Sequence, residues 1–134
     1  MRIAIIAHDS RKELMAQFCT AYLRILSENE LVATGVTGKV VHDACGLPVR
    51  CLYPGARGGA EQIAAMIGCG EIDMLLFFRD PVSAKPGEPN DVMLLRLCDM
   101  HTIPVATNIA TAEVLIHGLE RGDLAWIELQ RGRK

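Results

Sequence analysis

Residues 2–38 predict the fold, and they read RIAIIAHDSRKELMAQFCTAYLRILSENELVATGVTG. The run Arg2–Ala7 is apolar after its first residue, which is typical of a strand covered on both faces of a parallel sheet. Ser10 followed by Glu13 is a capping box at the start of a helix. Apolar side chains then recur at helical spacing: Leu14, Phe18, Tyr22 and Leu26. A second strand, Leu31–Thr34, completes a β-α-β unit.

The rest of the chain repeats this alternation of short apolar runs and helical patterns. Further strands are expected at Val49–Tyr53, Met74–Phe78 and Pro104–Thr107. Further helices are expected at Val40–Ala44 (after a glycine-rich turn, Gly35–Gly38), Glu61–Ile67, Asp91–Met100 and Ala110–Leu119. Prolines and glycines between residues 79 and 89 predict a long loop. Strands that are each followed by a helix predict an α/β fold: a single-domain, open, five-stranded parallel sheet flanked by helices.

Length and charge limit the class of protein. The chain has 134 residues, the size of one domain spanning 1–134. Its 14 basic and 16 acidic side chains give a formal net charge of −2. That balance argues against nucleic acid as a partner, because non-specific binding needs a dense Lys/Arg field. No window approaches the roughly 18 apolar residues of a membrane helix, and the basic residues 131–134 are expected to be solvated.

The cysteines indicate the cellular compartment. There are five, an odd number with no C-x-x-C pair: Cys19, Cys45, Cys51, Cys69 and Cys98. In a secreted domain this pattern would leave an unpaired thiol, so a cytoplasmic location is expected. We expect the cysteines to be small buried hydrophobic residues rather than redox or metal sites.

Polar residues gather where the predicted strands end, and ligands of open parallel sheets bind beyond the carboxyl ends of the strands. These residues are His8, Asp9 and Lys12, then Thr34–Gly38, Pro54–Gly59, Arg79–Asp80 and Thr107–Asn108. Glycines let backbone N–H groups approach an oxyanion, and a helix start adds its positive dipole end. Together with the charge of Lys12, they predict an anion site.

Each of these residues alone has a second interpretation. The TGVTG turn matches neither G-x-G-x-x-G nor a P-loop, and it is equally typical of a tight turn between strand and helix. His8 fits a structural histidine as well as a ligand contact. Lys12 fits a solvated cation, although a cation in a first helical turn opposes the dipole unless an anion is bound. For Asp80, an ion pair with Arg79 and a cap for the following loop both stay open.

Six stretches carry a more specific pattern. They are Ile3–Asp9 (IAIIAHD) with Lys12, Phe18–Tyr22 (FCTAY), Leu31–Gly38 (LVATGVTG), Phe77–Pro81 (FFRDP), Leu94–Asp99 (LLRLCD) and Ile103–Ala112 (IPVATNIATA). With them the chain resembles the methylglyoxal synthase family along essentially its whole length. The resemblance implies conversion of dihydroxyacetone phosphate to methylglyoxal and phosphate, without a metal or organic cofactor. It also implies a five-stranded parallel sheet between helices and a homohexamer.

The resemblance assigns roles to particular residues. Five stand where the family binds substrate, largely through its phosphate: His8, Lys12, Thr34, Gly35 and Thr37. Gly55 matches the glycine of the family's Ser-Gly phosphate contact, with Pro54 in place of the serine. Val36 replaces a threonine of the same phosphate turn. Asp80 matches an aspartate of the family's active site.

Three positions depart from the family's acid–base residues. The family's catalytic base, an aspartate that removes a carbon-bound proton, is Ala60 here. A histidine and an aspartate of the family's site are Gly87 and Asn90. Glu61 is adjacent to the base position, but one helical residue rotates a side chain by about 100°. Since a general base typically contributes ~10²–10⁴-fold, these changes affect the chemistry more than the binding.

Three functions are therefore weighed. The first is a carbon–oxygen lyase in which Glu61 takes the role of base and Asp80 assists. The second is a catalytically degenerate protein that binds a small phosphorylated ligand or inorganic phosphate, as related domains do in carbamoyl phosphate synthetase. The third is a structural subunit that assembles with an intact paralogue.

Overall fold

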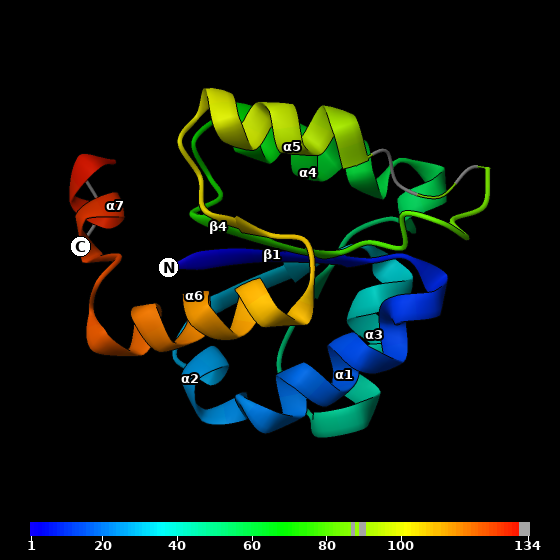
Figure 1. The fold of residues 1–134 in the computed structure, drawn as a ribbon, viewed down its shortest axis with the longest axis horizontal. Coiled ribbons are helices and arrows are strands. Elements are labelled where there is room, and N and C mark those ends of the chain that lie inside the picture. Colours follow the sequence, from blue (N-terminus) through cyan, green and yellow to red (C-terminus); the bar gives the residue numbers. More distant parts are fainter. Residues whose placement is uncertain (87, 89–90, 132–134) are drawn as a thin grey trace.

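The computed structural model describes residues 1–86, 88 and 91–131, and it contains one parallel sheet with helices on both faces (Figure 1). The strands are β1 (Arg2–Ala7), β2 (Glu30–Ala33), β3 (Arg50–Cys51), β4 (Met74–Phe78) and β5 (Val105–Ala106). Their order in the five-stranded sheet is β3-β2-β1-β4-β5, and all pairs are parallel. The predicted open α/β fold is confirmed. The two edge strands are shorter than expected, as is common for strands with one unpaired side.

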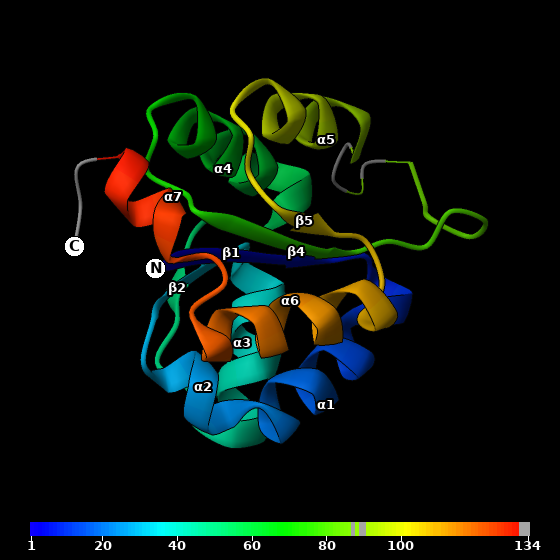
Figure 2. The ribbon, with the colours of Figure 1, turned by 60° about the vertical axis from the view of Figure 1, so that its left-hand side comes forward.

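Helices cover both faces of the sheet. They are α1 (Lys12–Ala21), α2 (Leu23–Ser27), α3 (Gly35–Cys45), α4 (Gly59–Gly68), α5 (Asp91–Met100), α6 (Ile109–Arg121) and α7 (Ala125–Gln130). Two short 3-10 turns, η1 (Asp9–Arg11) and η2 (Gly55–Arg57), precede α1 and α4. Figure 2 shows α4 and α5 on one side of the sheet and α1, α3 and α6 on the other. No helix in the described part of the chain is long and apolar enough to span a membrane.

The central strand β1 explains the continuously apolar pattern. Its side chains alternate between two cores: Ile3 and Ile5 pack under α1, α3 and α6, whereas Ala4 and Ile6 pack under α4 and α5. All four are fully buried. A strand covered on both faces cannot alternate apolar with polar residues, so the sequence reads as one apolar run.

Helix α3 begins earlier than predicted, because the glycines of the expected Gly35–Gly38 turn form its first turn. A Cβ on Gly35 would lie 2.7 Å from the carbonyl oxygen of Leu52, and one on Gly38 would lie 2.6 Å from Sγ of Cys51. These glycines therefore let the helix pack closely against the β3 segment, and they do not interrupt it.

The predicted capping box is wrong. Arg11 is the N-cap of α1, and no side-chain capping bond is formed there. Ser10 lies in η1, and its hydroxyl donates instead to Oδ2 of Asp80 over 2.5 Å. A hydrogen bond between residues that follow two neighbouring strands thus takes the place of the local capping bond.

The five cysteines differ in burial, and Cys45 is half-buried. Cys19 and Cys98 are buried, as expected, and burial raises the pKa of the Cys19 thiol to about 12. Cys51 and Cys69 are exposed, so the expectation of burial is wrong for them. Cys51 lies on the short edge strand β3, and Cys69 directly follows α4.

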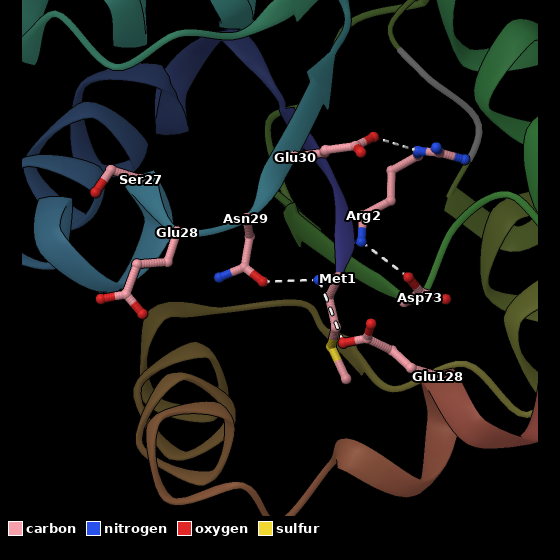
Figure 3. Close-up of a pocket in the computed structure, with 8 residues that line it drawn as sticks. All are labelled: Met1, Arg2, Ser27, Glu28, Asn29, Glu30, Asp73 and Glu128. Carbon is pink, nitrogen blue, oxygen red and sulfur yellow. Dashed lines mark hydrogen bonds and ion pairs between the residues drawn. The ribbon is translucent and has the colours of Figure 1, made fainter. Parts of the chain in front are cut away.

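Figure 3 shows a pocket near the amino end of β1 whose polar lining residues contact one another. The Met1 amino group donates to Oδ1 of Asn29 over 2.9 Å. The buried Asp73 carboxylate accepts from the Arg2 N–H at 2.8 Å and pairs with the Arg131 guanidinium at 3.1 Å. Arg131 is therefore not solvated as predicted, because it follows α7 back onto the sheet. Residues 132–134 lie outside the described residues.

Candidate active site

A cavity of about 310 Å³ lies at the carboxyl edge of the sheet. Residues that follow β1, β2 and β3 line it, together with the loop between β4 and α5. Four of its lining residues are predicted substrate-binding residues: Lys12, Thr34, Val36 and Gly55. Segments far apart in the sequence thus meet where an open parallel sheet binds its ligands.

The start of α3 forms one wall of this cavity. Thr34 is its extended N-cap residue, and the Gly35 N–H donates to the Tyr53 carbonyl over 3.0 Å. The Gly38 N–H donates to the Thr34 carbonyl over 2.8 Å. The first N–H groups of a helix have no acceptor within it, so that of Val36, which lines the cavity, can donate to a ligand. This arrangement, with the positive end of the helix dipole, suits an anion.

Thr37 and Gly35 support this wall without lining the cavity. Thr37 is buried, and its hydroxyl oxygen accepts from the Thr34 hydroxyl over 3.3 Å. Gly35 provides the close approach to the β3 segment described above. Their contribution is therefore the position of the α3 backbone.

Lys12 supplies a positive charge to the cavity. Its side chain is only 15% exposed, so the interpretation as a solvated cation is wrong. Nζ donates to the Ala7 carbonyl over 3.0 Å and to Oδ1 of Asp9 over 2.5 Å. These bonds to Lys12 lower the pKa of Asp9. An ammonium group has three N–H donors, so one remains for a ligand.

His8 is buried and does not line the cavity. Its Nδ1 accepts a hydrogen bond from the Asp80 backbone N–H over 2.8 Å. Its ring meets Phe77 edge to face, with ring centroids 5.1 Å apart. Because Nδ1 is an acceptor, the neutral ring carries its proton on Nε2. The predicted substrate residue thus also has a structural role.

Asp80 caps the loop that follows β4, one of the two structural roles weighed for it. Its Oδ1 accepts from the N–H groups of Val82 and Ser83 over 3.0 and 2.8 Å. The Ser10 hydroxyl bond, followed by these backbone bonds, lowers the pKa of Asp80 to about 2. Arg79 pairs instead with a carboxylate at the start of α5, at 3.1 Å. Asp80 is buried and does not line the cavity.

The predicted acid–base positions hold no proton acceptor that faces the cavity. Ala60 is 2% exposed and packs on the core under α4. Glu61, the predicted substitute base, is exposed on α4 and does not line the cavity. Gly87 and Asn90 lie outside the described residues. The structure therefore brings four of the predicted binding residues together at the cavity, but not the predicted catalytic pair.

Two residues of the cavity escaped the sequence analysis, Lys85 and Glu88. Both lie in the loop between β4 and α5. Glu88 Oε2 accepts from the Asp9 N–H over 2.9 Å, and Oε1 accepts from the Lys85 N–H over 2.9 Å. The only sequence signal for them is that two charged residues lie in a proline-rich loop. Charged side chains in such loops are usually solvated. No group of three or more His, Cys, Asp or Glu side chains among the described residues is placed to hold a metal ion.

Comparisons with known proteins identify the family. The MGS-like domain family matches residues 15–107. A methylglyoxal synthase of Caldicellulosiruptor saccharolyticus is 56% identical over 129 residues, which cover 96% of this chain and 92% of that relative. The chain belongs to the methylglyoxal synthase family.

Further comparisons extend the similarity over the whole chain. A methylglyoxal synthase of Oceanobacillus iheyensis is 54% identical over 134 residues, covering 100% of this chain and 96% of that relative. The crystal structure of methylglyoxal synthase from Elizabethkingia anophelis has a TM-score of 0.84 at 33% identity, over 86% of this chain and 76% of that one. The resemblance to the methylglyoxal synthase family is confirmed, whereas the departures at Ala60, Gly87 and Asn90 stay predictions.

Proposed function

We propose that the protein binds dihydroxyacetone phosphate in this cavity and converts it to methylglyoxal and inorganic phosphate. One observation carries the proposal: the start of α3, Lys12 and Gly55 meet in a cavity at the carboxyl edge of the sheet. Relatives more than half identical to this chain are named methylglyoxal synthase, which supports the same substrate here.

The phosphate group binds at the start of α3 in this proposal. The N–H group of Val36 donates to its oxygens, and the ammonium groups of Lys12 and Lys85 balance its charge. Bonds between charged groups and phosphate are shorter and roughly twice as strong as neutral ones. The cavity of about 310 Å³ is at the lower end of ligand-site volumes, as suits a three-carbon substrate.

The reaction begins at the hydroxymethyl carbon of the substrate. A base removes a proton there, and the electron pair forms an enediolate. The enediolate then expels phosphate by breaking the C–O bond of the phosphate-bearing carbon on the other side of the carbonyl, and that carbon gains a proton to become the methyl group. Atoms and electrons balance without an oxidant or a cofactor.

A protein that binds the ligand without chemistry is the second candidate. The burial of Ala60 and the exposure of Glu61 favour it, because neither offers a base to the cavity. Asp80 does not help, since three donors already occupy its carboxylate.

Two measurements on the purified protein test these candidates. The first is titration with inorganic phosphate, and the second is methylglyoxal formation from dihydroxyacetone phosphate at high enzyme concentration. Saturable binding with product formation supports the lyase, and saturable binding without product supports the second candidate. An absence of saturable binding contradicts both candidates and leaves the third function, a structural subunit. Pulldown of a mixed oligomer from the source cell tests that function.

The assembly and the location are expectations of the same proposal. The resemblance implies a homohexamer, and the odd number of cysteines favours a reducing cytoplasm. Light scattering of the purified protein tests the first expectation. A mass of one or two chains contradicts it.

A further inference from the structure

We infer that Glu88 is the catalytic base of this protein and supplies the carboxylate that the family's base position, Ala60, lacks. The inference rests on the proposed function, since a base has a role only if the substrate binds in the cavity described above. It assigns the proton-abstracting group to the loop between β4 and α5 rather than to α4.

Glu88 lies in the same cavity as the predicted phosphate-binding residues Lys12, Thr34 and Gly55. The loop that carries it leaves the carboxyl end of β4, at the end of the sheet where α3 begins (Figure 1). A ligand whose phosphate rests on the start of α3 therefore has its carbon atoms within the cavity that Glu88 lines.

The Glu88 carboxylate is held in a fixed orientation. Its Oε2 accepts from the Asp9 N–H and its Oε1 from the Lys85 N–H, each over 2.9 Å. The two bonds fix both oxygens to backbone atoms, so the side chain is ordered before a substrate arrives. Each carboxylate oxygen has a second lone pair, and one of these is available to accept a proton.

The other nearby carboxylates are poorly suited to the role. Asp9 also lines the cavity, but its bond to Lys12 lowers its pKa and so weakens it as a base. Asp80 accepts three hydrogen bonds, has a pKa of about 2 and does not line the cavity. Glu61 is exposed on α4 outside the cavity. Among the described residues that line this cavity, Glu88 is left as the candidate base.

The chemistry requires one proton acceptor at this point. The Glu88 carboxylate takes a proton from the hydroxymethyl carbon, and the C–H electron pair becomes part of the enediolate. Phosphate then leaves with the electrons of its C–O bond and takes up the hydroxyl proton of the enediolate, whose carbon becomes the aldehyde, and the neutral Glu88 carboxyl donates its proton to the carbon that phosphate left. Lys12 and Lys85 line the cavity and stabilise the negative charge that develops.

Glu88→Gln is the decisive variant, with methylglyoxal formation and phosphate binding both measured. We expect product formation to fall by about 10²–10⁴-fold, the usual contribution of a general base. Phosphate binding should be retained or become tighter, since a negative charge has been removed from the cavity. Glu88→Asp, which keeps a carboxylate, should recover part of the activity.

Glu71→Gln is the matched control, because Glu71 is exposed near the amino end of β4 and does not line the cavity. Unchanged thermal midpoints exclude unfolding as the cause of any loss. An active protein whose Glu88→Gln variant keeps its rate contradicts the inference and leaves the proposed lyase intact. Phosphate binding without any product in the natural protein also contradicts it. No phosphate binding contradicts the proposed function itself.

Discussion

The backbone N–H of Asp80 donates to Nδ1 of His8 over 2.8 Å and joins the ends of β1 and β4. Both residues are buried. The bond fixes the plane of the imidazole ring and leaves its proton on Nε2 in the neutral form. Two residues that the sequence analysis placed in the site, one for substrate binding and one for catalysis, thus hold two neighbouring strand ends together.

Replacing His8 tests this structural role. His8→Ala leaves the buried Asp80 N–H without its acceptor, which should lower the free energy of unfolding by about 1–3 kcal/mol. In His8→Asn the side-chain carbonyl takes the place of Nδ1, so the loss should be smaller. Urea unfolding of the two variants measures the difference. Equal losses would show that the acceptor does not matter.

The hydrogen bonds of Asp80 predict a dependence of stability on pH. The Ser10 hydroxyl and two backbone N–H groups lower its pKa to about 2, whereas an unfolded aspartate titrates near 3.9. A lowered pKa stabilises the fold fully above about pH 4, and this stabilisation is lost as pH falls toward 2.

Thermal midpoints of the natural protein and of Asp80→Asn, compared from pH 7 to pH 2, measure this effect. We expect the difference between the two thermal midpoints to be constant above about pH 5 and to narrow on acidification. Protonation of Asp80 removes the negative charge, and the asparagine of the variant carries no such charge at any pH. A difference that is the same at pH 7 and pH 2 contradicts the assignment.

The fold was predictable because its evidence is local. The apolar runs of β1 and β4 and the helical spacing of α5 reach the structure with their predicted bounds. Ser10 was misassigned because a serine three residues before a glutamate has the same pattern whether it caps a helix or binds Asp80. Only the arrangement of strands in space distinguishes the two.

The candidate site was only partly predictable for the same reason. Lys12, Thr34, Val36 and Gly55 follow strands directly, so the sheet topology alone places them at one edge. Glu88 lies in a loop that lines the cavity, and its carboxylate binds the backbone of Asp9, which is distant in the sequence. No periodicity or spacing in the sequence encodes that contact.

The close contact at the start of α4 predicts a strong effect of a small substitution. A Cβ on Gly59 would lie 1.9 Å from the Tyr53 carbonyl oxygen, which is backbone and cannot move aside cheaply. Gly59→Ala should therefore lower the free energy of unfolding by about 1–3 kcal/mol or more. Gly68→Ala, at the other end of the same helix, meets nothing within 4 Å and should be neutral or slightly stabilising. Similar losses in both variants would contradict the packing argument.

The ion pair between Arg131 and Asp73 predicts a second stability effect. Asp73 is 1% exposed, and Arg131 is 16% exposed. Arg131→Ala removes a charged partner of a buried carboxylate, which should cost about 1–3 kcal/mol. Arg24→Ala breaks only exposed ion pairs and should cost less than about 1 kcal/mol. Chemical denaturation of both variants measures the difference, and a larger loss for Arg24→Ala would contradict this account.

The central claim is that the cavity at the start of α3 is a phosphate site. Isothermal titration with inorganic phosphate tests it most directly, on the natural protein, on Lys12→Gln and on the control Lys39→Gln, an exposed lysine of α3 outside the cavity. We expect saturable binding that Lys12→Gln weakens by about 10–100-fold, since a charge-assisted bond contributes about 1.5–3 kcal/mol, and that Lys39→Gln leaves nearly unchanged. No saturable binding, or equal weakening by the two variants, would contradict the claim.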